Sequence, residues 1–168
     1  MNATTERLRI RPLTTGDLDA LAAIYDDPQV MRFSLGRLDR DKTREKLERH
    51  VTLNRESGQG AHALEDLGDG RFVGIAGLQP QTVDGVDEIE IGYRLMPESW
   101  GKGLATEATR ALLAHAFAEL GLPRVISIIE PANVGSIRVA EKAGLTLEKE
   151  TMMWDRDVRI YVAAPNKP

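Results

Sequence analysis

Cysteine is absent from this chain of 168 residues, aromatic residues make up only 5% of it, and no run of about 18 apolar residues occurs. Without cysteine the chain has no disulfide, no thiolate nucleophile and no cysteine-ligated zinc, and its composition is compatible with a reducing compartment. The first residues form no apolar leader, so neither secretion nor membrane spanning is indicated. We therefore expect a cytoplasmic protein without a membrane partner.

An excess of positive charge is also missing. Lys and Arg total 22 against 26 for Asp and Glu, which gives a formal charge of -4. Such a chain is not attracted as a whole to phosphate backbones, so we expect no nucleic-acid partner. Hydrophobic residues at 42% and charged residues at 29% are typical of a globular protein. The length predicts a single domain over residues 1–168.

Alternating apolar residues and turn residues predict the elements of the first half of the chain. We expect a strand over 8–13, a helix from Thr14 or Thr15 to Asp27, a second helix over 42–55, a β-hairpin over 61–67 and 72–78, and a strand over 88–95. Asp69 and Gly70 are predicted to form a tight type I′ turn, and Asp84 with Gly85 a further turn. The last three strands are therefore predicted to be antiparallel.

The second half begins with a predicted helix over 103–120 that is apolar around most of its circumference and must be largely buried. We then expect a strand over 125–129, a helix over 134–143 capped by Asn133, and strands over 145–153 and 158–163 around a turn at 155–157. A crossover through the buried helix makes a parallel strand pair plausible. The predicted fold class is mixed α+β.

A glycine loop joins the strand 88–95 to the buried helix. Gly101 and Gly103 leave backbone N–H groups unobstructed where the helix begins, and this helix end suits a pyrophosphate. Lys102 can add positive charge. A plain connecting loop is the alternative, and so is a dinucleotide site, because Gly101, Gly103 and Thr106 partly match Gly-x-Gly-x-x-Gly. The dinucleotide pattern fits poorly, since about five residues separate the strand from Gly101 and hairpins replace the first βαβ half.

Two blocks of sequence resemble the GNAT superfamily of acetyl-CoA-dependent N-acetyltransferases, in the branch that contains the ribosomal-protein N-terminal acetyltransferases (RimJ/RimL-like). They are Glu90-Ile91-Gly92-Tyr93 through Trp100-Gly101-Lys102-Gly103-Leu104-Ala105-Thr106-Glu107-Ala108, and Asn133-Val134-Gly135-Ser136 through Ala143-Gly144-Leu145. With the opening strand, the likeness covers nearly the whole chain in order. The Gln or Arg that usually precedes the first loop glycine by three residues is replaced here by Glu98.

The resemblance implies a mostly antiparallel central sheet of about six to seven strands flanked by helices, with the fourth and fifth strands splayed apart. Pantetheine of the acetyl-CoA cosubstrate then pairs with exposed strand backbone in this gap. The cofactor-binding residues implied are Arg94, Leu95 and Met96 for pantetheine, Gly101, Lys102, Gly103, Leu104, Ala105 and Thr106 for the pyrophosphate, and Asn133 in the second block.

Two catalytic residues follow from matching the family pattern. Glu90 is the expected base, acting directly or through water, because the attacking amine must first lose a proton. A solvent-facing strand residue is the alternative. Ser136 is expected near the cofactor sulfur, and local capping of the helix start is its alternative. Tyr93 alternates to the face opposite Glu90 and is predicted to lie in the core.

The resemblance implies that the acceptor is a primary amine. The family branch favours the N-terminal α-amino group of a protein, while an aminoglycoside, a polyamine or another small amine fits almost as well. Without cysteine, transfer is expected by direct attack in a ternary complex. A non-catalytic acyl-CoA-binding module is the competing class. No metal is expected, because His50, His62 and His115 are widely spaced. The final strand pair offers a sheet edge for a homodimer.

Overall fold

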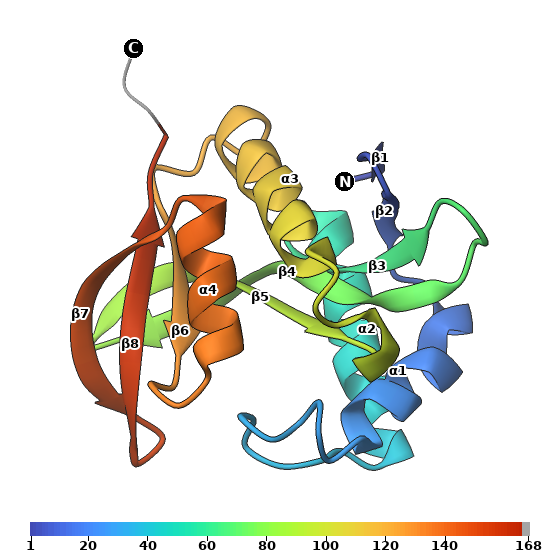
Figure 1. Ribbon diagram of the computed structural model, residues 1–168, viewed down its shortest axis with the longest axis horizontal. Coiled ribbons are helices and arrows are strands. Elements are labelled where there is room, and N and C mark those ends of the chain that lie inside the picture. The colour runs from blue at the N-terminus through green and yellow to red at the C-terminus, as the bar shows by residue number, and fades with distance from the viewer. Residues whose placement is uncertain (166–168) are drawn as a thin grey trace.

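The computed structural model describes residues 1–165. Within this range the strands form one eight-stranded sheet in the order β1-β2-β3-β4-β5-β6-β8-β7 (Figure 1). The strands are β1 (Ala3–Thr4), β2 (Leu8–Pro12), β3 (Gly60–Asp66), β4 (Phe72–Val83), β5 (Val86–Leu95), β6 (Val125–Ile129), β7 (Thr146–Met153) and β8 (Arg156–Ala163). The α-helices are α1 (Leu18–Asp26), α2 (Arg40–Ser57), α3 (Leu104–Ala118) and α4 (Val134–Ala143). The mixed α+β fold is confirmed.

The sheet has one strand more than the expected six to seven. The additional strand is β1, whose two residues pair antiparallel with β2 through Ala3–Ile10 and Thr4–Arg9. Two residues are too few to show the alternation by which a strand is recognised in a sequence.

The helices cover both faces of the sheet, and strand alternation assigns each side chain of β5 to one face. Ile91 and Leu95 belong to the core cluster that contains the buried side of α3. The opposite face packs against α1 and α2 through a second cluster that includes Tyr25 and Ile75. Figure 1 shows α3 and α4 on the near side of the sheet and α2 behind it. Glu90, an even-numbered strand residue like Arg94, therefore faces the side of α1 and α2.

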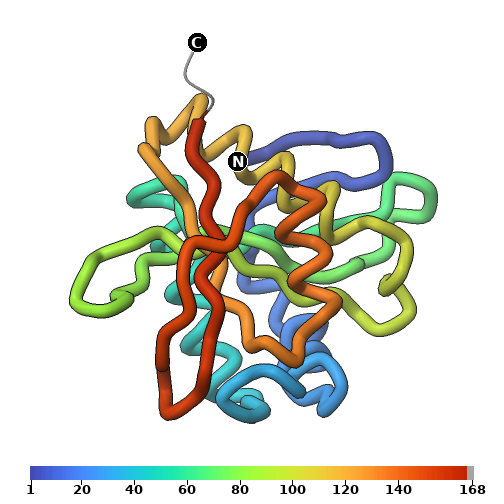
Figure 2. Tube along the Cα trace, turned by 60° about the vertical axis from the view of Figure 1, so that its left-hand side comes forward, coloured from blue at the N-terminus to red at the C-terminus, as the bar shows by residue number. Residues whose placement is uncertain are grey.

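Strands β5 and β6 form the predicted parallel pair, and a single pair of residues is in register between them. Glu90 and Ile126 are the one pair in their register, whereas β5 pairs with β4 over its full length from Val86 to Leu95. Beyond Glu90, β5 continues for five residues without β6 beside it. The splayed pair expected from the family resemblance is confirmed by this register. Figure 2 shows the course of the chain in a second view.

The hairpin turns differ from the prediction. The tight turn with positive φ at both central residues is at Asp84 and Gly85, with φ of 50° and 79°, which is typical of type I′. The loop before β4 is longer: the N–H of Asp66 bonds to the carbonyl of Arg71, and Gly70 alone between them has a positive φ. The type I′ prediction for Asp69-Gly70 is therefore wrong, because four residues separate the paired ends.

The last hairpin turns one residue earlier than expected. Trp154 and Asp155 both have positive φ, 53° and 58°, and Met153 pairs with Arg156. Arg156 thus begins β8 and does not lie in the turn. From this position on β8, the guanidinium of Arg156 reaches the loop between α1 and α2, where it donates to the carbonyl of Ser34.

Candidate active site

Glu90 lies at the point where β5 and β6 begin to separate, and its carboxylate is partly enclosed between the sheet and α2. The side-chain amide of Gln79, directly opposite on β4, donates a hydrogen bond of 2.8 Å to Glu90 Oε2. Burial raises the pKa of Glu90, and the hydrogen bond from Gln79 and the charge of Arg94 offset part of that shift. A carboxylate with a raised pKa is a better proton acceptor near neutral pH than an exposed one.

The charges of Lys46 and Arg94 act on the carboxylate of Glu90, and sequence reasoning missed Lys46, Tyr25 and the side chain of Arg94. Lys46 of α2 and Arg94 of β5 each approach the ring of Tyr25 in α1, with Nζ 5.5 Å and Cζ 5.6 Å from its centroid. Arg94 was predicted for its main chain only. The alternation of β5 could have indicated that its side chain shares the face of Glu90, whereas nothing in α2 distinguishes Lys46 from the other cations of that helix.

Ser136 lies in the first turn of α4 on the opposite face of the sheet. Its N–H donates to Asn133 Oδ1 at 3.2 Å, so Asn133 caps the helix as predicted. The hydroxyl of Tyr93 donates to Ser136 Oγ at 3.0 Å. Tyr93 is half-buried and packs against the core, but its hydroxyl reaches a candidate catalytic residue, so the core prediction was incomplete. Glu90 and Ser136 therefore lie on different faces of β5.

The glycine loop brings an open backbone to the start of α3. Gly101 and Gly103 adopt φ of 70° and 79°, and Gly103 is the residue that precedes the helix. Helix geometry leaves the N–H groups of Leu104, Ala105 and Thr106 without an intrahelical acceptor. The side chain of Leu104 is buried, so this residue can offer a ligand only its main chain.

Neighbouring side chains hold this loop without filling it. Arg7 donates to the carbonyl of Lys102 at 2.7 Å and forms an ion pair with Glu107 at 2.7 Å. Thr5 donates to the same carboxylate at 2.6 Å, so the acidic residue in the first turn of α3 is already engaged. A Cβ at Gly101 would meet nothing within 4 Å. Lys102 and Glu98 are both exposed. The residues present therefore fit a pyrophosphate bound by backbone.

The end of β5 determines which main-chain groups can serve pantetheine. The N–H of Met96 donates to the carbonyl of Val73, and its own carbonyl accepts from Ser99, both at 2.9 Å. Both main-chain groups of Met96 thus have a partner within the protein, while its carbonyl keeps a second lone pair, so its predicted contact with pantetheine stays a prediction. Because antiparallel hydrogen bonding alternates, the groups of Arg94 also point toward β4, while those of Leu95 point toward the gap.

The carbonyl of Leu95 already has one partner. The indole N–H of Trp100 donates to it at 2.8 Å, and the ring of Trp100 remains exposed. A carbonyl has two lone pairs, so this bond leaves room for a second donor.

A protein-family model described as an acetyltransferase (GNAT) domain matches residues 7–146, which is most of the chain. The chain belongs to the GNAT acetyltransferase family. The uncharacterised protein YkkB of Bacillus subtilis is 34% identical over 158 residues, covering 94% of this chain and 92% of the relative. The family assignment makes the protein an acetyl-CoA-dependent N-acetyltransferase.

Solved GNAT structures share the fold. An acetyltransferase from Agrobacterium tumefaciens superimposes with a TM-score of 0.86 at 28% identity, covering 98% of this chain and 95% of that chain. The ribosomal-protein-S5-alanine acetyltransferase of Vibrio fischeri gives 0.83 at 18% identity with full coverage of both. The spermidine N-acetyltransferase of Vibrio cholerae, solved with CoA and spermine, gives 0.78 at 19% identity, covering 95% and 96%. The last two show the fold alone.

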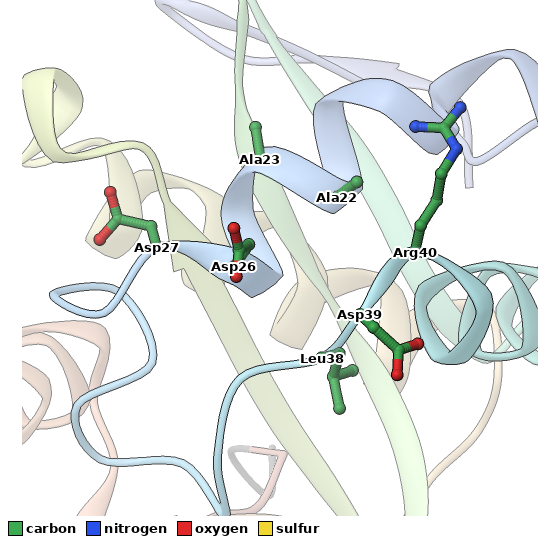
Figure 3. Close-up of a pocket in the computed structure, with 7 residues that line it drawn as sticks. All are labelled: Ala22, Ala23, Asp26, Asp27, Leu38, Asp39 and Arg40. Carbon is green, nitrogen blue, oxygen red and sulfur yellow. The ribbon is translucent and has the colours of Figure 1, made fainter.

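Among residues 1–165 no three His, Asp or Glu side chains are placed to hold a metal ion, and none of the helices is long and apolar enough to cross a membrane. A surface hollow of about 560 Å³ lies between the end of α1 and the start of α2 (Figure 3). Asp26, Asp39 and Arg40 line it, and none of the predicted site residues does.

Proposed function

We propose that this protein transfers the acetyl group of acetyl-CoA to a primary amine by direct attack in a ternary complex. The observation that carries the proposal is the place of Glu90 at the last contact between β5 and β6, partly buried and with a raised pKa. The family resemblance implies that the acetyl group lies beside this strand. A carboxylate there can take the proton that the amine must lose.

The glycine loop and strand β5 would bind different parts of acetyl-CoA. The backbone N–H groups from Gly101 to Thr106 would hold the pyrophosphate, aided by the charge of Lys102. Leu95 would offer its main chain to pantetheine, and Asn133 lies near enough to Ser136 to serve both the helix start and the cosubstrate. Bound acetyl-CoA supplies a thioester carbonyl as the electrophile.

Two side chains of the protein would accept and donate hydrogen during the reaction. An α-amino group with a pKa near 8, or a lysine near 10.4, arrives mostly protonated. Glu90 accepts the proton, directly or through a water molecule. Ser136 offers its hydroxyl to the departing sulfur, because its oxygen already accepts from Tyr93 and its own hydrogen is free to donate.

The acceptor we favour is the N-terminal α-amino group of a protein. The putative ribosomal N-acetyltransferase YdaF of Bacillus subtilis, 39% identical over 83 residues, supports this choice. The spermidine N(1)-acetyltransferase of Escherichia coli, 26% identical over 152 residues, supports a small-molecule amine as the alternative. Retention of Glu90 and Ser136 favours catalysis over the alternative of a non-catalytic acyl-CoA-binding module.

The test begins with calorimetric titration of the purified protein with acetyl-CoA, with NAD as the control. We expect micromolar binding of acetyl-CoA and none of NAD. Release of CoA is then followed with protein N-terminal peptides, aminoglycosides and polyamines. Turnover with any amine would support the proposal, whereas binding of acetyl-CoA without turnover over the whole panel would favour the binding module.

A further inference from the structure

Lys46 and Arg94 are two cations beside the ring of Tyr25, and neither forms an ion pair with a carboxylate of the described residues. Both approach the ring of Tyr25, and both are half-buried. Among residues 1–165, neither has a carboxylate oxygen within 4.0 Å, although Glu90 is close enough to affect them electrostatically. The side-chain partner of Arg94 is the neutral hydroxyl of Ser34, at 3.1 Å.

Two other arginines, Arg156 and Arg124, are paired, whereas Arg49 of α2 is exposed and has no ion pair among the described residues. Arg156 forms an ion pair with Glu130 at 2.5 Å, and Arg124 contacts both Glu88 and Glu148. Arg156 also donates to the carbonyl of Ser34 at 3.3 Å. Ser34 thus connects the paired guanidinium of β8 to the unpaired guanidinium of β5, and it places the loop between α1 and α2 over this part of the sheet.

Holding two like charges together in a partly enclosed place is unfavourable. Burial lowers the pKa of Lys46, and the charges of Arg94 and Arg49 lower it further, with only Glu90 acting in the other direction. The hydroxyl of Tyr25 is buried there without a hydrogen-bond partner among the described residues. An anion that approached Lys46 and Arg94 would relieve their repulsion and could also accept from Tyr25.

This anion would lie on the acceptor side of the sheet. Arg94 and Glu90 are on the face covered by α1 and α2, whereas the glycine loop leads into α3 on the opposite face. The phosphates of the cosubstrate are expected at the start of α3. Lys46 and Arg94 are therefore available to bind a group of the amine substrate.

We propose that Lys46 and Arg94 bind an anionic group of the acceptor, so that the substrate is a primary amine with a carboxylate or phosphate a few bonds away. This rests on the proposed function and specifies its substrate class. The anion can belong to a small amino acid or to an acidic side chain beside a peptide's α-amino group. A polyamine is a poor substrate, because its additional ammonium groups are repelled by Lys46 and Arg94.

The test compares amines that differ in one charge. Glutamate is paired with its diamide, a peptide beginning with Asp is paired with the same peptide beginning with Asn, and spermidine is the cationic member. We expect kcat/KM to be about tenfold or more higher for the anionic member of at least one pair, and lowest for spermidine. The pair that shows the preference identifies the source of the anion. Equal rates within both pairs, or a preference for spermidine, would overturn the inference and leave the proposed function intact.

Matched variants assign the preference to these residues. Lys46→Met keeps the length of the side chain and removes the charge, and Lys42→Met does the same one turn earlier, where Lys42 is exposed beside Asp39. Lys46→Met should reduce the anionic-to-neutral ratio of kcat/KM about tenfold, and Lys42→Met should leave it unchanged. Arg94→Gln, a second variant, should act like Lys46→Met. A ratio unaffected by both Lys46→Met and Arg94→Gln would contradict the inference.

A binding measurement separates this inference from catalysis. N-acetylglutamate, used as a product-like probe, should raise the Tm of the parent protein and of Lys42→Met more than that of Lys46→Met. If no amine is acetylated although acetyl-CoA binds, the proposed function fails, and the same Tm comparison still decides whether Lys46 contributes to anion binding.

Discussion

The hydroxyl of Tyr93 donates a hydrogen bond of 3.0 Å to the hydroxyl oxygen of Ser136, 43 positions later in the chain. The bond joins β5 to the first turn of α4 on the face away from Glu90. It uses Ser136 Oγ as an acceptor, so the hydrogen of that hydroxyl is directed elsewhere. Tyr93 is therefore a positioning residue for Ser136.

Replacement of Ser136 by Ala should lower kcat about tenfold while the affinity for acetyl-CoA stays within a factor of about two, because the hydroxyl is needed when the thiolate departs. Tyr93→Phe should lower kcat by a smaller factor, also without raising KM for acetyl-CoA. Steady-state kinetics with both substrates varied provides the check. Full activity of Ser136→Ala would limit Ser136 to the helix start, where its N–H bonds to Asn133.

Glu90→Gln should lower kcat/KM about a hundredfold or more, since the amide cannot accept the proton of the amine. In the parent protein, kcat/KM should rise with pH as Glu90 ionises at its raised pKa, and this rise should disappear in the variant. Glu88→Gln is the matched control, because Glu88 lies on the same face of β5 and pairs with Arg124. An unaltered pH profile in Glu90→Gln would remove Glu90 from the mechanism.

Gly103→Val should weaken acetyl-CoA binding at least about tenfold, because a branched side chain at a φ of 79° strains the loop and covers the N–H groups before α3. Calorimetry measures the affinity, and thermal unfolding shows that the variant is folded. The control is Gly121→Val, at the other end of α3, where φ is 62° and the new Cβ meets nothing within 4 Å. Gly121→Val should lower the Tm and leave the affinity for acetyl-CoA unchanged. Equal losses of affinity in the two variants would argue against pyrophosphate binding by the backbone of Gly101 to Thr106.

Buried His50 should make the protein less stable as pH falls. Burial, with Lys46 and Arg49 next in importance, lowers its pKa from 6.5 to about 4, and its Nδ1 accepts from the N–H of Ala61. Between pH 4 and pH 6.5 the unfolded chain binds a proton at His50 that the folded chain does not. The contribution of His50 to the free energy of unfolding is therefore fully present above pH 6.5 and is lost as the pH falls toward 4.

The loss from His50 between pH 7 and pH 5 should be roughly 2 kcal/mol. Urea unfolding at the two pH values measures it. His50→Gln keeps an acceptor for Ala61 and removes the titration, so its loss should be smaller by about that amount. Burial lowers the pKa of His62 to about 3, so His62 also makes the protein less stable as the pH falls, equally in the parent and in His50→Gln. An equal pH dependence in the parent and in His50→Gln would contradict this account.

Local patterns predicted much of this molecule because they report on short-range physics. Alternation along 88–95, apolar residues around most of 103–120 and the cap at Asn133 each reflect burial or hydrogen bonding within one element, and each was found where expected. Turn geometry was less accessible. Asp-Gly occurs at both 69–70 and 84–85, and the strand pairing on either side determined that only the second is a type I′ turn.

The amino-acid sequence was sufficient to predict the α+β class, the order of the main elements and the glycine loop, since these depend on residue types at short spacing. The role of Glu90 came from the family resemblance and stays a prediction. Long-range packing determined the rest. Tyr93 contacts Ser136, and both Lys46 and Arg94 approach Tyr25, only because a sheet and two layers of helices bring distant segments together. The spacing of residues along a chain contains no record of such contacts, and the charge and hydrogen bonding of this site depend on them.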